Sequence, residues 1–182
     1  MRGNNKGLTL VELLVSITIA GVLIVAAFSF MVSSSNIFKN LDIRKNLHMD
    51  SQLAANLIES YVIDCNENIY FSGDSLFVIN HESGEYIAHV FEGSGNSLNY
   101  AMSSAKKKPD GSYSCSYKAE DFICGNLENF SVEIFPLDFD KVSFVELKIS
   151  LEKNGVKQDI KKTIALRNKV TTKIVNFEDN ET

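Results

Sequence analysis

Residues 6–32 read KGLTLVELLVSITIAGVLIVAAFSFMV, and this stretch decides the architecture of the 182-residue chain. From Leu13 to Phe38 the chain contains no Asp, Glu, Lys or Arg. A helix needs about 20 consecutive apolar residues to cross the hydrocarbon core of a bilayer. We therefore predict a transmembrane helix over residues 8–35, preceded by a short polar leader over residues 1–7.

The charges around this helix predict its orientation. Arg2 and Lys6 precede the apolar segment, and positive flanks tend to stay in the cytoplasm. We expect the N-terminus inside and the residues after about 36 outside the cytoplasmic membrane. The formal net charge of −5 makes nucleic acid an improbable bulk partner, although a local basic patch remains compatible with it.

An amphipathic helix is predicted to follow over residues 36–64. Its apolar residues recur at spacings near three and four, which is the pattern of a helix with one face on a core. They are Ile37, Leu41, Leu47, Ala54, Leu57, Ile58 and Tyr61. No Pro or Gly lies between Val22 and Gly73. A continuous helix over residues 8–63 would be roughly 84 Å long at about 1.5 Å per residue, so its second half must pack on something other than lipid.

Residues 65–170 are predicted to form a β-rich head, because short β-type runs alternate with turn residues. The candidate strands are Ile69–Phe71, Leu76–Ile79, Tyr86–Phe91, Ser97–Met102, Tyr113–Tyr117, Phe130–Phe135, Val142–Leu151 and Val156–Leu166. Asn154-Gly155 is a strong hairpin signal. Residues 171–182 lack periodicity and are predicted to be a flexible acidic tail. The expected fold class is α+β, a long N-terminal helix packed by its second half on an antiparallel sheet.

Other candidate sites carry weaker signals. Cys115 and Cys124 lie nine residues apart and are predicted to form a loop-closing disulfide, with pairing of Cys65 to either as the alternative. The run 106–108 is Lys-Lys-Lys, either a contact for an anionic partner or a solvated loop tip. The three histidines lack metal-ligand spacing, and no catalytic or cofactor-binding motif is present. We expect no enzyme, metal or cofactor.

The N-terminal string Lys6-Gly7-Leu8-Thr9-Leu10-Val11-Glu12 resembles the class III signal of type IV prepilins and type II secretion pseudopilins. A carboxylate at the edge of an apolar helix is energetically costly, so Glu12 is unusual for a simple membrane anchor and a reason for its presence is needed. The resemblance supplies one. It implies that a prepilin peptidase cuts after Gly7, that Leu8 becomes the N-methylated first residue, and that Glu12 is the carboxylate needed for assembly.

The resemblance also implies the partners: the prepilin peptidase, other pilin subunits through the N-terminal helix, and an assembly platform in the membrane. The family more often has Phe at the position of Leu8, and many major pilins have a Pro within the apolar segment, where this chain has only Gly21. The run from Val156 to Asn168 looks like the closing strand of minor pilins of the W type and pseudopilins of the J type.

We therefore expect a minor pilin or pseudopilin that helps to assemble or initiate a pilus or pseudopilus on the cell surface. Two alternatives remain open. The chain could be a signal-anchored surface domain without a filament role, or a filament-tip module that binds DNA or a surface through its lysines.

Overall fold

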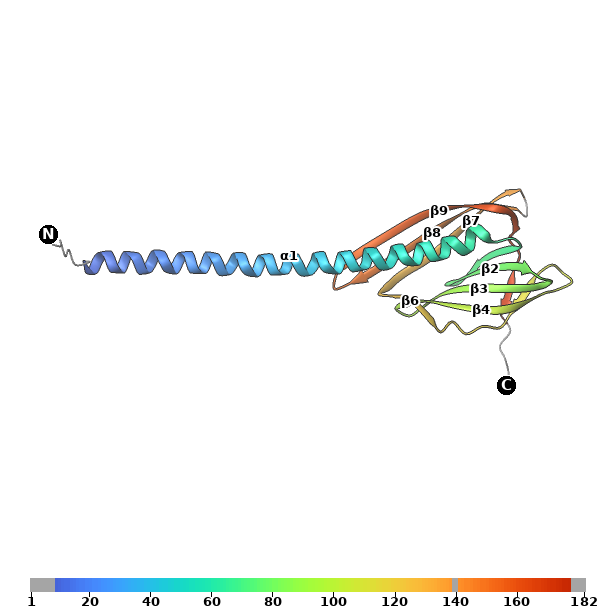
Figure 1. Ribbon diagram of the computed structural model, residues 1–182, viewed down its shortest axis with the longest axis horizontal. Coiled ribbons are helices and arrows are strands. Elements are labelled where there is room, and N and C mark those ends of the chain that lie inside the picture. The colour runs from blue at the N-terminus through green and yellow to red at the C-terminus, as the bar shows by residue number, and fades with distance from the viewer. Residues whose placement is uncertain (1–8, 139–140, 178–182) are drawn as a thin grey trace. The chain divides into compact units, whose positions relative to one another are not determined.

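The computed structural model describes residues 9–138 and 141–177, and the chain divides into two compact units, Met1–Asp42 and Ile43–Thr182. A single helix, α1 (Leu10–Asp64), contains most of the described first unit and continues into the second (Figure 1). This confirms the predicted long helix. After α1, Cys65 N–H donates to Val62 O at 3.2 Å, a tight final turn that ends the helix.

The part of α1 that belongs to the second unit has one buried face. Its buried residues are Leu47, Ser51, Ala54, Ala55, Ile58 and Val62, at the three-and-four spacing of a single helix face. Two adjacent alanines let the helix backbone approach the sheet closely. Three residues predicted to lie in this stripe are exposed instead: Ile37 by 56%, Leu41 by 54% and Leu57 by 38%.

The second unit also contains the sheet, in which ten strands lie within the described residues. They are β1 (Asn68–Ser72), β2 (Ser75–Glu82), β3 (Glu85–Ser94), β4 (Ser97–Lys107), β5 (Tyr113–Cys115), β6 (Asp121–Gly125), β7 (Leu127–Asp138), β8 (Lys141–Lys153), β9 (Val156–Thr171) and β10 (Val175–Phe177). Their order is β10-β5-β4-β3-β2-β1-β9-β8-β7, with β6 also on β4. All pairs are antiparallel except β1–β9 and β10–β5, so the α+β prediction is confirmed.

The long β8–β9 hairpin follows the sequence pattern closely. Asn154 and Gly155 both have positive φ, at 53° and 77°, and join Lys153 to its partner Val156. Along β8, alternate residues are buried, namely Val145, Leu147, Ile149 and Leu151. Those between them form the polar side of the sheet, as a strand with one solvated face requires.

Two strands were missing from the prediction. β6 pairs with the first part of β4, and β10 pairs with β5 through residues 175–177. The second finding corrects the predicted flexible tail, because Val175 is buried and lies in the sheet. Residues 178–182 of that tail lie outside the described residues.

Two apolar clusters pack on the sheet, one on each face of β2. Leu76 and Val78 of β2 face the cluster that includes α1, whereas Phe77 and Ile79 face a second cluster on the opposite side. The second cluster also contains Tyr113 and Cys115 of β5 and Val175 of β10. β2 is therefore buried on both faces, which explains its continuous apolar run.

Polar side chains, of which Asn68 is buried, join the residues just after α1 to the end of β9. Asn68 has no exposed surface; its Nδ2 donates to Lys173 O at 3.1 Å, and its Oδ1 accepts from Lys173 N at 2.7 Å. The Thr171 hydroxyl donates to the same Oδ1 at 2.9 Å. Asn168 Nδ2 donates to Cys65 O at 2.9 Å. The first residues after the helix are thus fixed to a strand about a hundred residues later in the chain.

Candidate processing and assembly segment

Thr9 starts α1 as its N-cap. Its Oγ1 accepts from Glu12 N–H at 3.3 Å, and its carbonyl accepts from Leu13 N–H at 3.1 Å. The Thr-x-x-Glu spacing is that of a capping box, in which the N-cap hydroxyl satisfies a backbone donor at the third helical position. Sequence reasoning missed this role, although the Thr-x-x-Glu pattern alone could have predicted it.

Glu12 therefore occupies the third helical position, in the first turn of α1. A negative charge there is favoured by the helix dipole. Its side chain is exposed, and within residues 9–138 and 141–177 the structure gives it no ion-pair partner. Gly7 and Leu8, the predicted cleavage and methylation residues, lie outside the described residues. The carboxylate is positioned by the helix but is not neutralised by any described residue of its own chain.

The apolar surface of the first unit is extensive. All residues from Leu10 to Val32 are exposed, including large side chains such as Phe28 and Phe30. Two polar side chains within the segment bond back to their own helix: Ser16 Oγ donates to Glu12 O at 2.7 Å, and Thr18 Oγ1 donates to Val15 O at 2.8 Å. By length and composition this helix can cross a membrane. Exposure of so large an apolar surface to water is unfavourable, so lipid or other protein must cover this part of the helix.

The family model described as "Prokaryotic N-terminal methylation motif" matches residues 2–28. This match includes residues 2–7 of the predicted leader, the capped helix start with Glu12, and most of the apolar segment. Comparisons with the curated proteins and with the solved structures gave no match.

The chain thus carries an N-terminal methylation motif, the class III signal found in type IV pilins and pseudopilins. The motif and the apolar helix fit a membrane-anchored protein, with one candidate span in the described residues. The motif is typical of structural subunits rather than of catalysts.

The structure does not bring the cysteines of the predicted disulfide together. Cys115 lies opposite Ala105 of β4 and Cys124 lies opposite Leu98 of the same strand. Seven residues of strand separate these positions, or about 23 Å at roughly 3.3 Å per residue. A disulfide needs Cα atoms within about 7 Å, so the fold holds these two cysteines too far apart.

The three cysteines are all buried, and none of them is in a disulfide. Burial raises the pKa of Cys65 to about 11 and that of Cys124 to about 11, because the thiolate would lose its hydration. These two thiols therefore behave as small apolar side chains.

The Lys-Lys-Lys run, residues 106–108, lies only partly in a loop. Lys106 and Lys107 are the last residues of β4, and Lys107 Nζ lies 2.6 Å from Glu67 Oε1. The same oxygen accepts from Tyr113 OH at 2.5 Å. Burial would raise the pKa of the Glu67 carboxyl, but the hydrogen bonds from Lys107 and Tyr113 outweigh it and lower this pKa. Lys107, the central residue of the Lys-Lys-Lys run, is therefore paired with a carboxylate of its own chain.

The three histidines lie on three different elements. His48 is on α1, and His81 of β2 stacks on Tyr86. His89 is buried between the sheet and α1, where its ring contacts Tyr61 at a centroid distance of 4.5 Å and its Nδ1 lies 2.8 Å from Tyr100 OH. In the described parts of the chain, His, Cys, Asp and Glu form no group that could hold a metal.

Proposed function

We propose that this protein is a minor type IV pilin or pseudopilin, a structural and non-enzymatic subunit that helps to start or cap a filament. The observation that carries this proposal is the methylation motif at residues 2–28 on a helix whose apolar side chains are exposed. A single helix can be held by lipid in the membrane and later by neighbouring helices in a filament, because both surroundings are apolar.

The chemistry of assembly follows from two charges. Cleavage after Gly7 creates an α-amine on Leu8, which is N-methylated and mostly protonated at neutral pH. A carboxylate in apolar surroundings is tolerated when a cation pairs with it and costly when it is alone. Glu12 of one subunit then pairs with the Leu8 amine of a neighbour, and this pair sets the register of otherwise featureless apolar helices.

The position of α1 supports the cleavage site. The first helical residue is Leu10, so the bond after Gly7 precedes the helix, with Leu8 and Thr9 between them. A peptidase needs an extended backbone at the bond that it cuts, and a helix that begins at Leu10 is compatible with cleavage after Gly7.

The remaining assignments complete the proposal. The prepilin peptidase and an assembly platform in the cytoplasmic membrane are its partners, along with other pilins. The N-terminus lies inside and the head outside until the subunit enters a surface filament. The minor role rests on the resemblance of Val156–Asn168 to the strand of W-type and J-type proteins; this run lies in β9, which is followed by β10.

N-terminal mass analysis of the membrane and filament fractions tests the function. We expect a mature chain that begins at N-methylated Leu8. An intact Met1 would instead indicate a plain signal-anchored surface domain, and a start near Ser35 would indicate ordinary signal peptidase. The tip-binding alternative is less favoured, because Glu67 already binds Lys107.

A further inference from the structure

The charges that follow the apolar segment are unevenly distributed. The first ones after Phe38 are Lys39, Asp42, Arg44 and Lys45, so three cations and one anion lie within seven residues. After residue 45 the chain has 13 basic and 21 acidic residues, a formal charge of −8. A short basic segment, residues 39–45, thus separates an uncharged span from an acidic head.

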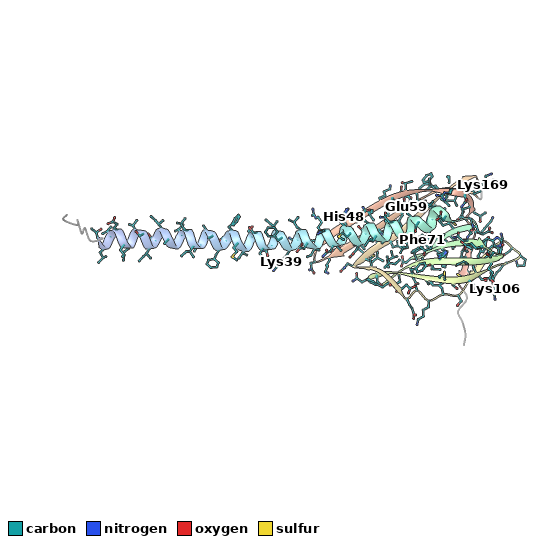
Figure 2. All side chains as sticks on the ribbon, viewed as in Figure 1. Lys39, His48, Glu59, Phe71, Lys106 and Lys169 are labelled. Carbon is teal, nitrogen blue, oxygen red and sulfur yellow. The ribbon has the colours of Figure 1, made fainter. Side chains whose placement is uncertain are left out.

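Within the described residues these three cations have no ionic partner. Lys39, Arg44 and Lys45 are exposed on α1, where Figure 2 labels Lys39, and none of them lies within ion-pair distance of a described carboxylate. Asp42 lies three residues from both Lys39 and Lys45 but bonds to neither. Elsewhere in the described chain, at least seven basic side chains form ion pairs with carboxylates.

The length of the uncharged segment places Lys39 at a membrane surface. Leu13 to Phe38 is 26 residues, or about 39 Å at roughly 1.5 Å per residue. The hydrocarbon core is about 30 Å thick, and about 40–45 Å with the head groups. A helix that enters the bilayer near Leu13 therefore leaves it among the head groups at Lys39. Long Lys and Arg side chains one or two turns beyond can reach back toward the same layer.

We propose that Lys39, Arg44 and Lys45 bind the phosphates of anionic phospholipids and so fix the depth at which α1 leaves the membrane. Anionic lipid attracts basic residues next to a span, whereas the acidic head is repelled by the same surface. The segment holds the helix exit at the phosphates while the head stays in solution. The inference rests on the membrane span of the proposed function but does not depend on cleavage or assembly.

The test uses the full, uncleaved chain in vesicles. The sequence contains no Trp, so Phe38→Trp places a single fluorescent reporter next to Lys39. Vesicles of phosphatidylcholine are compared with vesicles that also contain phosphatidylglycerol, with bromine-labelled lipids as depth-dependent quenchers. We expect phosphatidylglycerol to increase quenching and shift emission to the blue, and high salt to reverse both changes.

The variant Lys39→Gln/Arg44→Gln/Lys45→Gln should lose this response. The matched control, Lys106→Gln/Lys153→Gln/Lys169→Gln, makes the same change in charge at exposed lysines of the second unit and should keep it. The proposal is overturned if phosphatidylglycerol has no effect on the parent protein, or if the control loses the response equally. It is also overturned if quenching follows protein density rather than lipid charge, because the cations would then bind acidic residues of a neighbouring subunit. Failure of filament assembly with an intact lipid response would reject the proposed function alone.

Discussion

Replacing Asn68 by Ala should destabilise the head more than any other single amide substitution in its polar network. The side chain is fully buried and is within hydrogen-bond distance of three atoms, Lys173 O, Lys173 N and the Thr171 hydroxyl, at 2.7–3.1 Å. Each hydrogen bond contributes about 1 kcal/mol net, and a buried group that loses its partner costs about 1–3 kcal/mol. We expect the free energy of unfolding to fall by about 3 kcal/mol.

Pulse proteolysis of the full chain in detergent across a urea series measures this loss, because only unfolded heads are cleaved. At an m-value of about 2 kcal/mol per molar, the urea midpoint should fall by about 1.5 M. Asn176→Ala is the matched control, since it removes the same amide from an exposed position of β10. Equal midpoints for the two variants would refute the idea that Asn68 secures the joint between α1 and β9.

Four further outcomes are expected. Gly7→Leu should block processing in cells that carry a prepilin peptidase, which immunoblotting detects as retained precursor; normal maturation would move the cleavage site elsewhere. Glu12→Ala should be inserted and cleaved but missing from sheared filaments, because the Leu8 amine loses its partner; wild-type amounts in filaments would leave Glu12 without an assembly role. Acidification below about pH 6.5 should destabilise the head. The reason is that burial lowers the pKa of His89, so the unfolded state binds a proton that the native state resists. A His89→Gln variant should flatten the pH dependence of the urea midpoint, and an unchanged slope would assign it to other groups. Gly93→Val should lower the free energy of unfolding by about 1–3 kcal/mol, because a Cβ there would lie 3.2 Å from Leu127 Cδ2. An unaltered urea midpoint would mean that Leu127 of β7 moves aside without cost.

The sequence determined the parts of the protein that depend on local pattern. A charge-free run and a stripe at helical spacing are properties of neighbouring residues, so α1 could be predicted within two residues at its start and one at its end. The Asn154-Gly155 hairpin and the alternating face of β8 are local in the same sense. The methylation motif is a string of adjacent residues, which explains why the amino-acid sequence alone shows its resemblance to prepilins.

The structure decided what depends on distant segments. β10 is three residues long, too short to show a period, and it exists because residues 175–177 pair with residues 113–115. Cys115 and Cys124 are close in sequence, but they lie on β5 and β6, which pair with different parts of β4. Lys107 reads as part of a basic run, yet Glu67, forty residues earlier, binds it. Burial, strand pairing and ion pairs depend on contacts between segments that are far apart in the chain. The local pattern of a single sequence does not show which of these segments come into contact.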